Sequence, residues 1–312
     1  MNLIKNYRYL KLAFGIVLFA FLIKWIGFTN ILETLKQFDW TLFPLIILFY
    51  FAAEMLGAIN FYLLARPIKM GISFPKYLRY YFLSWSIGYF VPGKIGEYSI
   101  VYFLKDKVSI GKGTMLFVLN KMISFAVVMV IAAFGMFKFF AQVQALKLVA
   151  MMVAASVLAI FFILHPAGRG IIRKYILRKY AKKFTGFGAS FLGYLRDEKR
   201  RIVVNYLLTV AKWVFQTMVV FLAFHSFGSS IEYIDVFLIH AIVSIIGIIP
   251  ITIAGLGIKE GSAVFLYQFV GEKAVVTADA YIVMLFLFYT VAVTILIYHE
   301  LAKNKPNRLF HT

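Results

Sequence analysis

Long apolar runs recur along the chain, separated by short stretches that are polar or basic. Six of them lie at about 9–28, 41–65, 114–137, 146–164, 202–227 and 278–301. A helix that crosses a bilayer needs about 20 predominantly apolar residues. The pattern therefore predicts about six transmembrane helices.

Two further apolar stretches, at about 75–104 and 233–271, are interrupted near their middle. The breaks carry Pro92, Gly93, Lys94, Gly96 and Glu97 in the first stretch, and Pro250, Gly255, Gly257, Lys259 and Glu260 in the second. Each arm beside a break is shorter than a spanning helix. Both stretches are therefore predicted to be re-entrant helical hairpins, in which two half-helices meet at a glycine-rich tip.

The predicted tips imply a cavity. Irregular backbone at membrane depth needs hydrogen-bond partners from protein or water, because lipid offers none. Paired broken segments in the two halves of a membrane protein also mark transporter binding sites near the bilayer midplane. We expect the two tips to enclose a shared polar space.

Composition agrees with this interpretation. The chain has 312 residues, of which 62% are hydrophobic, and its mean hydropathy is +0.87. We expect an all-α polytopic membrane protein with one membrane domain over 1–312, divided into halves at 1–147 and 148–312. The formal net charge of +20 reflects membrane topology, and nucleic acid is not an expected partner. There is no cysteine, so disulfides are excluded.

The basic residues predict the orientation. The six-helix map places 24 of the 33 Lys and Arg on one side, eleven of them in the connection 165–201. Positive loops remain in the cytoplasm, so both termini and this connection are expected at the cytoplasmic face of the cytoplasmic membrane. The asymmetry holds only if the first hairpin enters from the cytoplasm and the second from outside, which is an inverted-topology pair. Setting topology is a sufficient role for the connection; the alternative is that it gathers anionic lipids.

Charged residues within apolar stretches are the candidate site. The N-terminus of each second half-helix favours an anion, and Lys94 and Lys259 add positive charge there. A phospholipid or polyprenyl-phosphate headgroup is the expected ligand. Glu97 and Glu260 would bind a headgroup amine, balance the lysines or exchange a proton; alternatively, they only cap their half-helices and pair with the adjacent lysines.

Other ionisable residues lie inside the predicted helices. Glu54 is a candidate cavity residue, whereas Lys121 and Lys212 either face the cavity or extend to the cytoplasmic interface. His240 is interpreted as a hydrogen-bonded packing residue. The five histidines have no metal-ligand spacing, and neither a metal, a cofactor nor a catalytic triad is expected.

The two tips carry a resemblance. Pro92, Gly96 and Glu97 match a Pro-x-x-x-Gly-Glu tip, and Gly255, Gly257 and Glu260 match a glycine-rich tip that ends in Glu. In these motifs and over nearly its whole length, the chain resembles the flippase-like family that includes the transmembrane region of lysylphosphatidylglycerol synthases and related stand-alone membrane proteins. The resemblance implies translocation of lipids such as aminoacylated phosphatidylglycerol, or of lipid carriers for envelope assembly.

The chain departs from the family pattern in three places. Ile100 stands where an Arg often follows the first tip, and Asn120-Lys121 stands where an acidic-basic pair often opens the next helix. The headgroup bound by other members is therefore not transferred. The sequence ends at Thr312 without the soluble aminoacyl-transferase domain, so a transporter is expected rather than an enzyme that makes aminoacylated lipid.

The leading hypothesis is a flippase-like transporter of a phospholipid or polyprenyl-phosphate-linked lipid, with membrane lipids of anionic or phosphate-bearing headgroup as partners. Two alternatives stay open. One is an integral-membrane enzyme that acts on a lipid-linked sugar or phosphate, and the other is a non-catalytic partner of envelope-synthesis enzymes.

Overall fold

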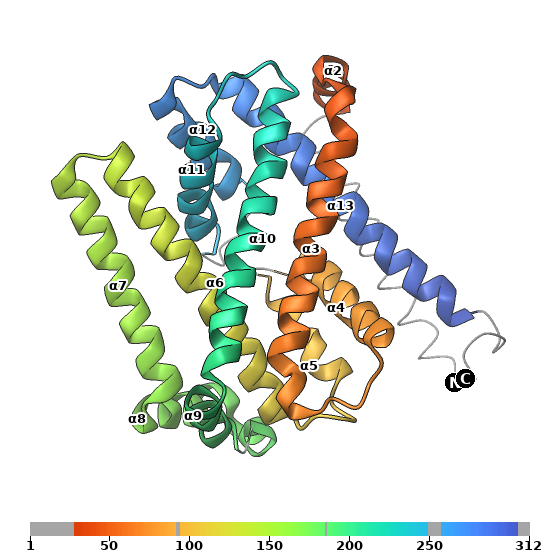
Figure 1. The fold of residues 1–312 in the computed structure, drawn as a ribbon, viewed down its shortest axis with the longest axis vertical. Helices are drawn as coiled ribbons and strands as arrows, with labels where there is room; N and C mark the ends of the chain where they lie inside the picture. Colours follow the sequence, from red (N-terminus) through yellow and green to blue (C-terminus); the bar gives the residue numbers. More distant parts are fainter. Residues whose placement is uncertain (1–27, 92–93, 185, 249–256, 305–312) are drawn as a thin grey trace.

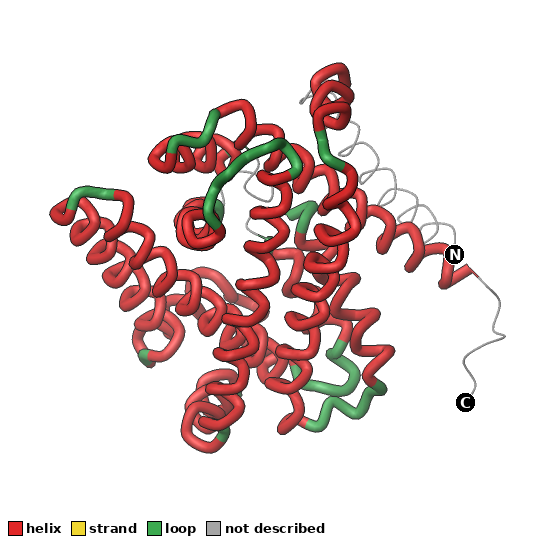
Figure 2. The backbone as a smooth tube through the Cα atoms, turned by 45° about the horizontal axis from the view of Figure 1, so that its top comes forward, coloured by secondary structure: helices red, strands yellow, loops and turns green. Residues whose placement is uncertain are grey.

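A computed structural model describes residues 28–91, 94–184, 186–248 and 257–304. Its described residues form helices without strands, joined by short connections (Figure 1, Figure 2). The prediction of an all-α protein is confirmed. The helices pack around two clusters of buried apolar side chains, one toward each end of the molecule.

Among the described residues, five helical segments are long and apolar enough to cross a membrane: Trp40–Ile68, Ile110–Phe139, Gln142–Leu164, Lys199–His225 and Ala274–Leu301. They correspond to five of the six predicted transmembrane helices. The sixth, at 9–28, lies outside the described residues apart from Phe28. We conclude that the chain is an integral membrane protein.

The long helices are α3 (Phe43–Ala65), α6 (Ile110–Phe139), α7 (Gln142–Leu164), α10 (Lys199–His225) and α13 (Ala274–Asn304). The N-terminal part holds α2 (Phe28–Gln37) and the short η1 (Trp40–Leu42), and α3 is followed by η2 (Arg66–Ile68). Asp39 caps η1 by accepting hydrogen bonds from the Thr41 N–H and hydroxyl at 2.9 and 2.7 Å, and these bonds lower the pKa of its carboxyl group.

Helices α3 and α10 pack closely along their length and form the centre of the molecule (Figure 1). The buried Asn60 amide donates to the Asn205 carbonyl at 3.1 Å and to Thr209 Oγ1 at 2.9 Å. Such bonds fix the register of two apolar helices, because leaving these groups without partners would cost about 1–3 kcal/mol.

Helix α7 has a different environment. Of its 23 residues only Ala145 is buried, and large apolar side chains such as Val143, Met151 and Val157 are more than half exposed. A helix that is apolar all round is stable when its outer surface contacts lipid. The exposure of its apolar side chains therefore supports the membrane assignment, in addition to the length and apolarity of the helix.

The first predicted hairpin contains α4 (Phe74–Gly88), η3 (Ile95–Tyr98) and α5 (Ser99–Phe103). The backbone of η3 lies against the end of α4, so closely that a Cβ on Gly96 would stand 2.5 Å from the Ile87 carbonyl oxygen. Only glycine allows this approach. The chain therefore folds back on itself between α4 and α5, and neither helix is long enough to span a bilayer.

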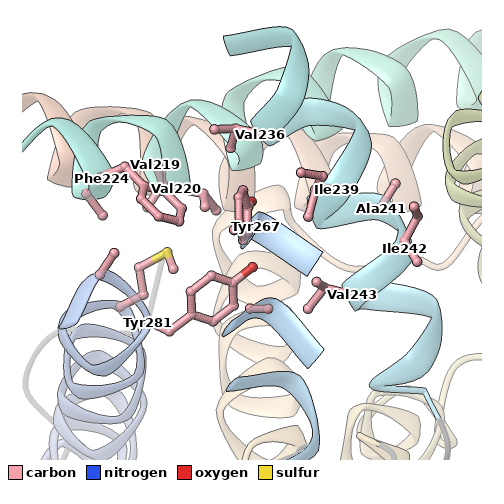
Figure 3. Packing of buried hydrophobic residues seen from close by; sticks show 14 of the residues in the cluster. Val219, Val220, Phe224, Val236, Ile239, Ala241, Ile242, Val243, Tyr267 and Tyr281 are labelled. Atoms are coloured by element: carbon pink, nitrogen blue, oxygen red, sulfur yellow. The ribbon is translucent and has the colours of Figure 1, made fainter. Parts of the chain in front are cut away.

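The second predicted hairpin contains α11 (Tyr233–Ile246), α12 (Ile258–Tyr267) and η6 (Gln268–Val270). Helix α12 packs on α11 and α13. Figure 3 shows Tyr267 and Tyr281 among apolar side chains of α10 and α11, including Val220 and Ile239. Figure 1 places α11 and α12 in the upper half of the molecule, and α4 and α5 in the lower half.

The basic connection between α7 and α10 is helical. It consists of α8 (Pro166–Ile171), the π-helical turn η4 (Ile172–Leu177), η5 (Arg178–Phe184) and α9 (Phe187–Asp197). Phe191 is buried, and the Tyr194 hydroxyl donates to the Leu64 carbonyl at 2.5 Å. The hydrogen bond ties α9 to the end of α3, while α9 packs against α6 and α10, and Figure 1 shows the connection at one end of the bundle.

Candidate functional site

A cavity of about 200 Å³ lies between α3, α4, α6 and α10, beside the first tip. Its lining combines four ionisable residues besides Lys94 with amide and aromatic side chains. The lining includes Glu54, Gly57, Tyr81, Lys94, Glu97, Asn120, Lys121, Lys212, Trp213 and Gln216. Polar space therefore does lie beside the first tip.

Two ion pairs cross this cavity. Lys121 of α6 donates to a Glu97 oxygen at the first tip, and Lys212 of α10 donates to Glu54 Oε2 of α3 at 3.4 Å. The Glu54 side chain is 7% exposed. Each of the two carboxylates is thereby matched by a lysine from a different helix, which offsets much of the cost of removing a charge from water.

Lys94 lies at the first tip without a carboxylate partner among the described residues. Its backbone is left-handed, with φ 55°, and its ammonium group stands 4.5 Å from the centroid of the Tyr89 ring. A left-handed lysine carries backbone strain of roughly 1–3 kcal/mol, while the aromatic face stabilises the cation. The geometry holds a lysine ammonium inside the cavity.

A second, smaller cavity of about 90 Å³ lies beside the second tip. Lys259 and Glu260, in the first turn of α12, line it together with His240 and Tyr281. Glu260 Oε2 accepts from the Gly257 N–H at 2.6 Å, and His240 Nδ1 is hydrogen-bonded to the Tyr281 hydroxyl at 2.9 Å. Glu260 is thus a helix cap, and His240 is a hydrogen-bonded residue of the lining.

The two cavities share Lys94 and Gln216 in their linings. The first tip and α10 therefore form the boundary between them. Lys259 has no ion pair within the described part of the chain, like Lys94. Counting the ionisable Glu and Lys that line the two cavities, three carboxylates face four ammonium groups. This arrangement favours an anionic ligand at Lys94 and Lys259.

The candidate residues fall into two groups. Glu54, Lys94, Gly96, Glu97, Gly257, Lys259 and Glu260 lie in or next to the two cavities, whereas Pro92, Gly93 and Gly255 lie outside the described residues. Glu97 pairs with Lys121, not with its neighbour Lys94. Glu260 follows the capping alternative, and its assignment as a ligand-binding residue remains a prediction.

The sequence left the orientation of Lys121 and Lys212 open, and it predicted no role for Tyr89, Trp213 or Gln216. Both lysines point into the larger cavity. The sequence feature that marks these two lysines is that each is a single lysine inside an apolar helix. The feature that marks Gln216 is an isolated amide side chain in such a helix. For Tyr89 and Trp213 the sequence carries no comparable signal, because aromatic residues are abundant throughout the chain.

The fold and these cavities define an integral membrane protein that encloses ionised side chains among its spanning helices. No group of three or more His, Cys, Asp or Glu in the described ranges is arranged to hold a metal ion. Residues 9–297 match the family model described as lysylphosphatidylglycerol synthase TM region, so the chain belongs to this family.

A curated relative has the same general character. The UPF0104 membrane protein PH1989 of Pyrococcus horikoshii is 23% identical over 297 residues, which cover 86% of this chain and 89% of the relative. Its name states a membrane location and no activity. The expected resemblance to a family of membrane regions is therefore confirmed.

Proposed function

We propose that this protein moves lipids with a phosphate-bearing headgroup across the cytoplasmic membrane. The observation that carries the proposal is the contrast between the cavity lysines: Lys121 and Lys212 are paired with carboxylates, whereas Lys94 and Lys259 form no ion pair within the described residues. An unpaired cation in a low-dielectric cavity is stabilised by an anionic ligand. A phosphate provides that anion.

Family membership supports a lipid as the source of the phosphate. The family name refers to a synthase of an aminoacylated phospholipid. The cavities also lie among helices whose outer surfaces are apolar, so the lipid tails would stay in the bilayer while the headgroup enters. Because Lys94 lines both cavities, a phosphate bound there is within reach of either compartment.

The proposal includes a membrane topology. Residues 75–104 and 233–271 form re-entrant hairpins that enter from opposite faces, and both termini lie in the cytoplasm. Alternating access would then move one half against the other around the shared lysine. Thiol labelling of single cysteines introduced at exposed positions, such as Lys107→Cys and Lys273→Cys, tests this part, since the chain has no native cysteine. The first should react only from the cytoplasm and the second only from outside.

The transport assay uses purified protein in liposomes that contain headgroup-labelled phosphatidylglycerol. A label that is protected from a membrane-impermeant reductant lies in the inner leaflet, so the protected fraction measures how much labelled lipid is in each leaflet. Lys94→Gln and Lys259→Gln should each slow exchange between leaflets, and the double variant should abolish it. Lys147→Gln, which removes an exposed lysine of α7 outside both cavities, is the matched control.

The proposal is rejected if a folded Lys94→Gln/Lys259→Gln variant exchanges the labelled lipid as fast as the control. The proposal is also rejected if the lysine variants lose exchange of a neutral sugar lipid but still exchange phosphatidylglycerol. The two lysines are proposed to bind the negative charge of the phosphate, which a neutral sugar lipid lacks.

A further inference from the structure

Two more cavities adjoin each other where the basic connection folds against the ends of α6 and α7. One, of about 570 Å³, has a mainly apolar lining that includes Val118, Phe162, Ile163, Ile172, Phe184 and Phe187. The other, of about 450 Å³, is lined by Gly170, Arg173, Lys174, Arg178, Ala181 and Lys182. Arg173 and Ala181 belong to both linings. An apolar and a basic compartment thus lie side by side.

Charge is distributed unevenly in this pair of cavities. Arg169 and Arg173 line the apolar cavity, and no acidic residue lines either cavity in the described part of the chain. The Arg169 guanidinium lies on Gly188, where a Cβ would stand 1.7 Å from Nη1. The glycine makes room for the arginine, whose charged group is held beside an apolar space.

The position along the bundle suggests which kind of molecule enters. The apolar cavity reaches the last turn of α7, where Phe162 and Ile163 line it and the helix ends at Leu164. One to two turns before that end, Val157, Leu158 and Phe161 are exposed, as expected for side chains that contact lipid. A lipid beside α7 can therefore insert a chain into the apolar cavity without leaving the bilayer, while its headgroup lies at the basic cavity.

We propose that these adjoining cavities bind an anionic phospholipid of the surrounding membrane, with one acyl chain in the apolar cavity and the phosphate in the basic cavity. Basic pockets at the ends of membrane helices recognise anionic headgroups in this way. The site is separate from the transport cavities and does not depend on the proposed transport. It gives the connection 165–201 a role beyond topology.

The test measures binding of dioctanoyl phosphatidylglycerol to the purified full-length protein in phosphatidylcholine nanodiscs. The Arg169→Gln/Arg173→Gln variant should bind about 25-fold more weakly, since each basic residue near an anionic surface contributes roughly a 5-fold factor. Ala189→Trp should also weaken binding, because it fills the apolar cavity without changing charge. Lys105→Gln/Lys107→Gln removes two exposed lysines outside both cavities and should bind like wild type.

Two soluble probes complete the design. Glycerol phosphate, which has no acyl chain, and polyglutamate, which mimics an acidic protein segment, should each compete poorly with the phospholipid. The inference is overturned if either probe competes as strongly as phosphatidylglycerol, or if the arginine variant binds like the lysine control. All variants retain Lys94 and Lys259, so any contribution of the transport cavities is common to them. Thermal unfolding verifies that each variant is folded.

Discussion

The Glu54 and Lys212 pair offers the sharpest test of the structure. Glu54 lies in α3 and Lys212 in α10, 158 positions apart, and their charged atoms are 3.4 Å apart. Their side chains are 7% and 25% exposed. The Glu54→Gln substitution keeps the size and polarity of the side chain but leaves the ammonium group of Lys212 without its carboxylate.

The magnitude follows from the distance and the surroundings. Two unit charges 3.4 Å apart interact with about 5 kcal/mol at an effective dielectric constant of about 20. Partial exposure of Lys212 weakens this attraction, so we expect a coupling energy of about 2–3 kcal/mol. Each single variant should lose about 3 kcal/mol of stability, because breaking a buried pair leaves one charge uncompensated.

The assay is a double-mutant cycle on the free energy of unfolding in mixed detergent micelles. Glu54→Gln, Lys212→Gln and the combined variant are compared with Lys147→Gln, which should change stability by less than about 0.5 kcal/mol. The combined variant should be more stable than the sum of the two single losses predicts. If the single losses are each below about 1 kcal/mol and simply add, then α3 and α10 do not bring these charges together and the described cavity is wrong.

Two further predictions concern packing next to the cavities. Gly96→Ala should prevent the first tip from closing on α4, since its Cβ would stand 2.5 Å from the Ile87 carbonyl oxygen; a loss of about 2 kcal/mol or more in unfolding free energy is expected, and an unchanged thermal midpoint would contradict it. Asn60→Leu should cost about 1–3 kcal/mol, because the Asn205 carbonyl and the Thr209 hydroxyl lose the amide that donates to them; proteolysis midpoints measure this loss, and equal stability would contradict the assigned hydrogen bonds.

The transmembrane segments could be predicted from sequence because length and apolarity are properties of a single stretch. Their ends could not be predicted as well. Helix α6 begins at Ile110 rather than near 114, and α13 begins at Ala274 rather than near 278. A helix can continue beyond its most apolar segment, so hydropathy does not locate the residue at which the helix begins.

The partners within the site required the structure. Pairing of Glu97 with the neighbouring Lys94 was one of the alternatives that the sequence left open, whereas in the structure Glu97 pairs with Lys121, 24 positions away. Whether a lysine inside a helix turns to a cavity or to the membrane surface depends on helix rotation, which a short apolar pattern with nearly uniform hydrophobicity does not define. The sequence therefore identified which residues are chemically unusual, while tertiary packing decided which of them meet.

Three glycines lie directly beside charged side chains that line the two cavities. A Cβ would come within 2.8 Å of Lys212 Nζ at Gly57, 2.6 Å of Glu97 Cγ at Gly88, and 2.2 Å of Lys259 Cε at Gly247. Glycine in a helix costs about 1 kcal/mol relative to alanine, and charged side chains in an apolar bundle need space as well as partners. The helix cost of each glycine is incurred beside a charged side chain, because the glycine leaves the space that this side chain occupies. The cavity charges are therefore held by surrounding backbone that is shaped for them, which is what a preformed binding site for an anion requires.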